Sequence, residues 1–123
     1  MNQSRPKNLN LFTIHFPIPA IISILHRMTG FALFLLIPVM IWALGYSLTE
    51  AGFDDLTRSL NTFYMKFIFW LLLIPFCFHL VAGIRHLLSD VHVGDTLLAG
   101  KISSYLTFII SFLLIVLAGI WLW

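Results

Sequence analysis

Three long runs of apolar residues dominate the hydropathy pattern of the chain. Met28–Leu48 and Ile102–Trp123 contain no charged residue, and Phe67–Ile84 is interrupted only by the polar side chain of His79. A helix that crosses the hydrocarbon core of a bilayer needs about 20 mostly apolar residues. The pattern therefore predicts an all-α integral membrane protein with three transmembrane helices. They cover roughly residues 20–48, 63–88 and 102–123 of a single membrane domain, residues 1–123.

The charged residues lie in the segments that separate or flank these spans. Thr49–Asn61 and Leu87–Lys101 are expected to be loops on opposite sides of the membrane, so the N-terminus shares a side with the second loop. Five basic residues fall on that side and two on the other: Arg5, Lys7, Arg27, Arg85 and Lys101 against Arg58 and Lys66. The positive-inside rule then predicts a cytoplasmic N-terminus.

Prolines mark the start of the first span and also lie inside the first and second spans. Proline is tolerated in the first turn of a helix, because the N–H groups of that turn have no intrahelical partner. Pro17 and Pro19 therefore predict a helix start near Ile18. Pro38 and Pro75 lie inside spans and are expected to kink them.

The composition supports a membrane protein and excludes other classes. Hydrophobic residues make up 60% of the 123 residues and charged residues 10%, whereas soluble domains carry about 25% charged residues. A chain this apolar cannot cover its surface in water, so its solvent is lipid. The net charge of only +2 gives no support to nucleic-acid binding.

His79 is the polar interruption of the second apolar run, Phe67–Ile84, and lies seven residues before His86. At 1.5 Å per residue it lies about 10 Å below the cytoplasmic end of the helix. His79, Gly83 and His86 share one helix face. A neutral imidazole ligates haem iron, and a nearby glycine leaves room for a flat macrocycle. The alternative, a histidine that hydrogen-bonds to a neighbouring helix, stays open on this evidence.

The chain offers no obvious second axial ligand within the predicted spans. The other histidines fall near the cytoplasmic boundary: His15, His26, His86 and His92. If two histidines hold the iron, the second comes from another polypeptide. This placement predicts that the chain forms part of a heteromeric helix bundle.

A second polar cluster, Ser23, His26 and Arg27, opens the first span, with Gly30 on the face that Ser23 and Arg27 share. A guanidinium can bind haem propionates or a quinone oxygen that gains charge on reduction. A serine hydroxyl can donate to a quinone carbonyl. The alternatives are snorkelling of Arg27 to lipid phosphates and simple helix packing by Ser23.

A third cluster lies at the cytoplasmic end of the second span and consists of Arg85, His86 and Asp90. Arg85 and Asp90 can pair around the helix end or dock a soluble partner. The alternative is an interfacial anchor with a solvated helix end.

Taken together, the clusters resemble a known family. The matching strings are Arg5-Pro6 with Asn8-Leu9, Ser23-Ile24-Leu25-His26-Arg27-Met28-Thr29-Gly30, and His79-Leu80-Val81-Ala82-Gly83-Ile84-Arg85-His86-Leu87 with Asp90. They resemble the cytochrome b subunit of bacterial-type succinate dehydrogenase, the larger of its two membrane anchors. The resemblance covers nearly the whole chain, and the strings are specific in combination although each alone is weak.

The resemblance implies a function and a set of partners. It implies an anchor in the bacterial inner membrane that, with a smaller second anchor, holds a flavoprotein and an iron–sulfur protein on the cytoplasmic face. Electrons from succinate would reach ubiquinone in the tricarboxylic acid cycle and the aerobic respiratory chain. The chain alone would not be an enzyme, but a subunit of succinate:quinone oxidoreductase.

The resemblance also implies roles for individual residues. His79 matches the axial ligand of one haem b, shared with a histidine of the smaller anchor. Ser23 and Arg27 match positions that line the quinone site, and His26 and Arg27 match positions near the haem propionates. His86 matches a position at the cytoplasmic haem edge.

Two alternatives keep the same three spans. The first is an anchor of a fumarate reductase that takes electrons from a quinol, because the same site can run in both directions. The second is a haem-free structural subunit, or a transporter subunit, whose polar residues only pack helices.

Overall fold

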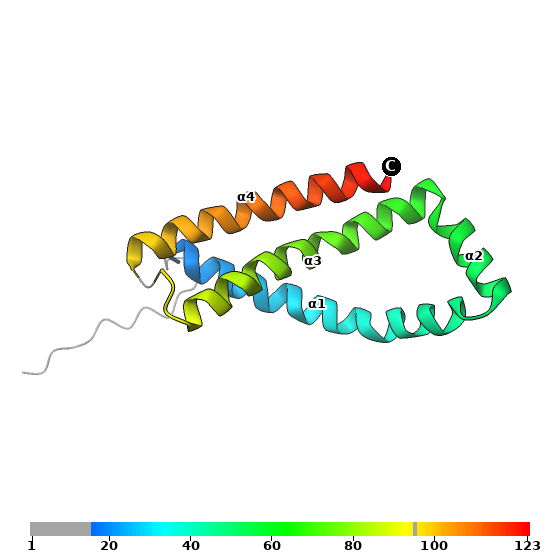
Figure 1. Cartoon of the computed structure of the whole chain (residues 1–123), viewed down its shortest axis with the longest axis horizontal. Helices are drawn as coiled ribbons and strands as arrows, with labels where there is room; N and C mark the ends of the chain where they lie inside the picture. The colour runs from blue at the N-terminus through cyan, green and yellow to red at the C-terminus, as the bar shows by residue number, and fades with distance from the viewer. Residues whose placement is uncertain (1–15, 95) are drawn as a thin grey trace, which may run out of the picture.

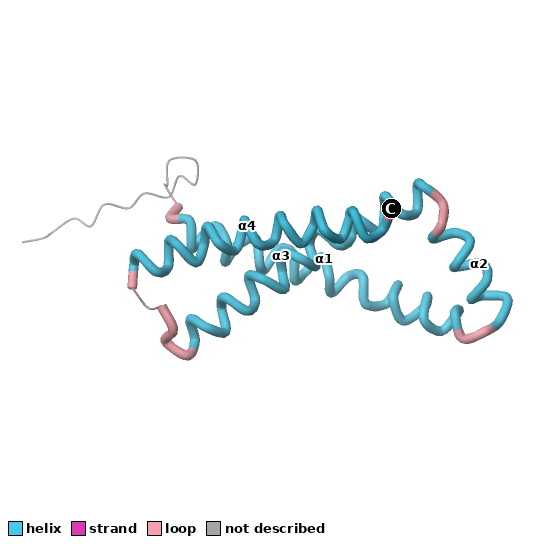
Figure 2. The backbone as a smooth tube through the Cα atoms, turned by 45° about the horizontal axis from the view of Figure 1, so that its top comes forward, coloured by secondary structure: helices cyan, strands magenta, loops and turns pink. Residues whose placement is uncertain are grey.

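The computed structural model describes residues 16–94 and 96–123, and helices make up nearly all of this backbone (Figure 1 and Figure 2). The helices are α1 (Ile18–Ser47), α2 (Glu50–Leu60), α3 (Phe63–Asp90) and α4 (Leu97–Leu122). Of these, α1, α3 and α4 are long and apolar enough to cross a membrane. The prediction of an all-α fold with three transmembrane helices is confirmed.

The three long helices run side by side between two ends of the molecule (Figure 1). The start of α1 and the turn between α3 and α4 lie at one end, which we call the basic end because Arg27, Arg85 and Lys101 lie in or near it. The short helix α2 and the C-terminus lie at the opposite end. Helix α3 contacts α1 and α4 more extensively than these two helices contact each other, so it is the central element of the bundle.

The expectation that Thr49–Asn61 is a loop is wrong, because most of this segment forms α2. Thr49 caps the helix, since its Oγ1 accepts a hydrogen bond of 3.1 Å from the N–H of Gly52. Glu50 in the first turn and Arg58 in the last turn complement the helix dipole. These local signals favour a helix even though the segment is polar.

The second connection is shorter than the expected loop Leu87–Lys101. Helix α3 continues to Asp90 and α4 begins at Leu97. The side chain of Thr96 caps α4, and Gly94 provides a left-handed residue with φ of 78° in the turn. A short capped turn keeps the two helices antiparallel and adjacent.

The predicted helix start near Ile18 is confirmed, because α1 begins at Ile18 directly after Pro17. Pro38 and Pro75 lie inside α1 and α3, and both helices continue through them. Figure 1 shows that α1 curves along its length. A proline inside a helix removes one main-chain hydrogen bond, which permits such bending.

The small apolar core joins α1 to α3 near the basic end. Ile22 and Ala82 are fully buried and Phe78 is nearly so, with Leu25 packed against them. Many other large apolar side chains are exposed. In a membrane these exposed side chains meet lipid or another protein, so the fold does not require a large internal core.

Helix α4 buries a row of small polar residues, Ser104, Thr107 and Ser111, rather than apolar ones. Ser104 and Thr107 donate back to main-chain carbonyls of α4, at 2.7 and 2.8 Å. Small residues let helices approach closely, and the back-bonded hydroxyls of Ser104 and Thr107 carry no unsatisfied donor into lipid. Ser111 differs, because its buried Oγ has no hydrogen-bond partner within the described residues. This row therefore suits a helix that packs inside a membrane bundle.

Trp70 joins α3 to α4 far from the basic end. Its Nε1–H donates to the carbonyl oxygen of Ile115 at 3.0 Å. The indole lies over Gly119, where a Cβ would come within 3.0 Å of Nε1. The packing of Trp70 on α4 therefore combines the hydrogen bond of the indole with the absence of a Cβ at Gly119.

Replacing Trp70 by Phe removes the donor but keeps an aromatic ring. We expect the free energy of unfolding to fall by about 1 kcal/mol or more, from the lost hydrogen bond and the smaller ring. The measurement is the thermal unfolding midpoint of the purified membrane protein. The control is Trp121→Phe, because Trp121 is 80% exposed. Equal midpoints for the two variants would contradict a stabilising role of the Trp70 contact.

Candidate functional site

His79 lies half-buried in α3 and hydrogen-bonds to α1. Its Nδ1 is 3.1 Å from the main-chain carbonyl oxygen of His26 and 3.2 Å from Oγ1 of Thr29. A polar group inside a bilayer is costly unless it has partners. Both partners come from one turn of α1, so this turn satisfies the imidazole of the neighbouring helix.

Three histidines from two helices gather around this contact, and we call them the histidine cluster: His26, His79 and His86. The rings of His26 and His79 stack with centroids 4.1 Å apart and planes 13° apart. The His86 ring lies 5.0 Å from that of His26 and is tilted by 42°. The structure thus brings together residues that are about 50 positions or more apart in the chain, with His26 between the two histidines of α3.

Two glycines make room for these rings between the helices. A Cβ on Gly30 of α1 would lie 2.8 Å from Cε1 of His79, which is too close without a shift of the ring. A Cβ on Gly83 of α3 would lie 3.3 Å from Nε2 of His26. Each glycine therefore accommodates an imidazole of the opposite helix.

Ser23 and Arg27 lie on α1 within one turn of His26, at the basic end. The side chain of Arg27 is exposed, and that of Ser23 is half-buried. Neither side chain makes a hydrogen bond or an ion pair in the part of the chain that the structure describes. A guanidinium and a hydroxyl near the membrane boundary are thus available to a ligand, to lipid or to another subunit.

Arg85 makes contacts with α4 rather than with Asp90. Its Nε donates to Oγ of Ser103 at 3.0 Å, and its Nη2 donates to the carbonyl oxygen of Gly100 at 3.4 Å. Within the described residues, the suggested pairing of Arg85 with Asp90 is therefore not present. Arg85 joins α3 to the first turns of α4.

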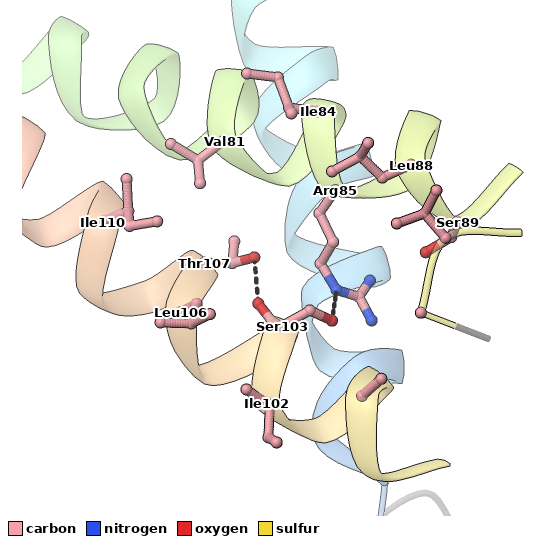
Figure 3. A pocket seen from close by; sticks show the side chains of 13 residues that line it. Val81, Ile84, Arg85, Leu88, Ser89, Ile102, Ser103, Leu106, Thr107 and Ile110 are labelled. Atoms are coloured by element: carbon pink, nitrogen blue, oxygen red, sulfur yellow. Dashed lines mark hydrogen bonds between the residues drawn. The ribbon is translucent and has the colours of Figure 1, made fainter. Parts of the chain in front are cut away.

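Arg85 also lines a groove of about 410 Å³ between α3 and α4, shown in Figure 3. Val81, Ile84 and Leu88 of α3 face Ile102, Leu106 and Ile110 of α4 across it. By helical periodicity, Val81, Arg85 and Leu88 lie on the face of α3 opposite to that of His79 and His86. The groove and the histidine cluster are therefore separate features, and the cluster faces α1.

Thr29 is a contact residue of this site that sequence reasoning missed. It belongs to the matched string, but its position in the sequence indicates no chemical role. Its hydroxyl is within hydrogen-bonding distance of His79, 50 residues away. No periodicity in the sequence identifies that contact, because it depends on how α1 and α3 pack.

The arrangement can provide one metal ligand but not a complete protein-made metal centre. Across residues 16–94 and 96–123, no three His, Cys, Asp or Glu side chains gather into a set that could hold a metal ion. His79 uses Nδ1 toward α1, which leaves Nε2 as its second ring nitrogen. Such a residue suits a metal that is already held by other groups, as iron is in a macrocycle.

Comparison with protein families decides the relationship of this chain. The model of the succinate dehydrogenase/fumarate reductase transmembrane subunit matches residues 1–118. The chain belongs to this family. The match covers α1, α3 and all but the last turn of α4, including the turns that carry the histidine cluster, and it makes the chain a multi-pass membrane subunit of such a complex.

Individual relatives agree with this assignment. The succinate dehydrogenase cytochrome b556 subunit of Coxiella burnetii is 44% identical over 125 residues, covering all of both chains. The proteins of that name from Rickettsia typhi and Rickettsia prowazekii are 35% and 34% identical over 114 residues. In both alignments, 92% of this chain and 89% of the relative are covered.

Replacing Gly30 by Ala should force the imidazole of His79 away from α1, because the added Cβ overlaps Cε1. Overpacking of this kind costs about 1–3 kcal/mol of stability. The control is Gly45→Ala in the same helix, where a Cβ meets nothing within 4 Å. Thermal unfolding of the purified membrane protein measures the difference. A Gly30→Ala variant as stable as Gly45→Ala would contradict the close approach.

Proposed function

We propose that this chain is the haem b- and quinone-binding membrane anchor of a succinate dehydrogenase, passing electrons from an iron–sulfur subunit to ubiquinone. The observation that carries the proposal is the imidazole of His79 in a membrane-spanning helix, with Nδ1 held by α1. The relatives are named cytochrome b556 subunits, and a cytochrome b contains haem. His79 is the residue of this chain that we assign to the iron.

The residues around His79 fit a haem with one ligand from this chain. Gly30 and Gly83 remove side chains that would press on the histidine rings. His26 does not qualify as the opposite axial ligand, because its ring stacks face to face on that of His79. A second histidine that would hold the same iron would have to lie away from the face of the His79 ring. We therefore assign the second axial histidine to a smaller partner anchor, with one haem shared between the two chains.

The basic end supplies side chains that can bind negatively charged or polar groups of the haem and the quinone. Haem b, when bound, supplies one-electron transfer. We assign Arg27 to the haem propionates and to the quinone, and Ser23 to the quinone. His26 and His86 lie beside His79 in the histidine cluster and so belong to the edge of the haem site. Arg27 stabilises negative charge that develops on a quinone oxygen, and Ser23 donates a hydrogen bond to it.

The orientation follows from charge, with the basic end and the N-terminus in the cytoplasm. Arg27, Arg85 and Lys101 lie at this end, whereas α2 at the other end carries Glu50, Asp54 and Asp55. Arg5 and Lys7, the other two basic residues predicted for the cytoplasmic side, lie outside the described residues. The flavoprotein and iron–sulfur subunits dock at the basic end, and the protein resides in the bacterial inner membrane.

The reverse physiological direction uses the same groups. The matched family includes fumarate reductase subunits as well as succinate dehydrogenase subunits. A site that stabilises charge on a reduced quinone serves both directions. The identity of the quinone and the growth condition, rather than the helices, distinguish the two.

Replacing His79 by Leu should abolish or strongly reduce the b-type haem spectrum of the purified complex, because the ligand of this chain is lost. The measurement is the reduced-minus-oxidised absorbance spectrum per mole of complex. The matched control is His92→Asn at the left-handed turn position after α3, where φ is 61°. Asparagine tolerates this conformation. An unchanged haem spectrum in His79→Leu would count decisively against His79 as the ligand.

Replacing Arg27 by Leu should lower quinone reduction on the order of 10²-fold, the usual effect of losing one charge-stabilising donor. Succinate oxidation by a soluble artificial acceptor should change much less, because it does not need the membrane site. The ratio of the two activities in the purified complex is the measurement.

The control for this variant is Arg58→Leu in the last turn of α2 at the opposite end. It removes the same charge from the chain without touching the basic end. Equal losses of both activities in Arg27→Leu would indicate faulty assembly and would overturn the role of Arg27 at the quinone.

A further inference from the structure

We propose that Thr29 is a positioning residue for His79. Together with the carbonyl of His26, it holds the Nδ1–H of the imidazole and leaves Nε2 as the nitrogen that ligates iron. This inference rests on the proposed function, because it takes His79 to be the haem ligand. It adds a residue of α1 that acts on the ligand without touching the iron.

The protons around Thr29 can be assigned from its neighbours. Its Oγ1 lies 2.9 Å from the carbonyl oxygen of Leu25 and 3.0 Å from that of His26. It also lies 3.2 Å from Nδ1 of His79. A hydroxyl has one proton, and carbonyl oxygens only accept. The proton of Thr29 therefore goes to a carbonyl of α1, and its oxygen is free to accept from His79.

The carbonyl of His26 decides which ring nitrogen of His79 carries the proton. It lies 3.1 Å from Nδ1. An unprotonated Nδ1 would set a lone pair against this carbonyl, so Nδ1 is the protonated nitrogen. The Nδ1–H then points to two acceptors on one turn of α1. In the neutral imidazole, the remaining lone pair is on Nε2.

This arrangement affects the strength of the ligand as well as its orientation. A hydrogen bond donated from the distal ring nitrogen fixes the tautomer and makes the imidazole a stronger donor to a metal. A stronger donor favours the ferric over the ferrous state and lowers the reduction potential. The Thr29 hydroxyl supplies part of this effect, and the stacked ring of His26 restricts rotation of the imidazole.

The test compares Thr29→Val, which has nearly the same shape but no hydroxyl, with Thr29→Ser, which keeps the hydroxyl. The matched control is Thr107→Val in α4. Thr107 is buried whereas Thr29 is half-buried, and like Thr29 it bonds back to its own helix, donating to the carbonyl of Ser103 at 2.8 Å. Each variant is studied as the purified complex by redox titration of the haem, by electron paramagnetic resonance of its ferric form and by haem content per complex.

We expect Thr29→Val to raise the haem midpoint potential and to change the ferric resonance. The affinity of the complex for haem should fall on the order of 10-fold, as is usual when a partner of a metal ligand is lost. Thr29→Ser and Thr107→Val should behave like the unaltered protein. Complete loss of haem in Thr29→Val with retention in Thr29→Ser would also support the role.

Two results would overturn the role of Thr29. One is an unchanged potential and resonance in Thr29→Val, and the other is an equal change in Thr107→Val or in Thr29→Ser. Failure of the proposed function looks different, because haem would then persist in His79→Leu. If haem is lost in His79→Leu but the potential and resonance are unchanged in Thr29→Val, the assignment of His79 as the ligand stands. Only the positioning role of Thr29 is then refuted.

Discussion

The contact between Nδ1 of His79 and the main-chain carbonyl of His26 is the constraint on which the bundle depends. Lipid offers no alternative partner to an imidazole N–H, so separating α1 from α3 at this level would leave a polar group unsatisfied. The neighbouring residues are arranged around this contact. Gly30 and Gly83 admit the histidine rings, and Ile22 and Ala82 pack against each other at the same end. This hydrogen bond and the close packing around it together restrict the separation and the rotation of the two membrane helices.

The rest of the bundle is held by a few contacts of the same kind and by little buried apolar surface. Arg85 joins α3 to α4 at the basic end, and Trp70 does so far from it. Most large apolar side chains remain exposed in the single chain. A helix surface of this composition is satisfied by lipid or by another membrane subunit. The membership of the chain in a family of complex subunits agrees with such an open bundle.

The two opposite faces of α3 contact different helices and carry different polar side chains. One face carries His79 and His86 and meets the helix that provides Ser23, His26 and Arg27. The other face carries Arg85 and the groove toward α4. The chemistry that we propose is therefore confined to the α1–α3 side, and α4 acts on it only through the position of α3. The Arg27 and Ser23 side chains, which have no partner within the described residues, lie on that same side.

The hydropathy pattern by itself determined the three spans, because an apolar run of this length has one stable form in a bilayer. The spacing of His79, Gly83 and His86 also placed them on one helix face without a structure. Helix α2 was not predicted, because its polar composition is typical of a loop. Thr49 at the helix start is nevertheless a capping residue that the sequence itself displays. Only the tertiary structure decided that His26 stacks on His79, that Thr29 reaches its ring and that Arg85 contacts Ser103 rather than Asp90. These contacts depend on the rotation and depth of one helix against another, and the periodicity within each helix carries no information about either.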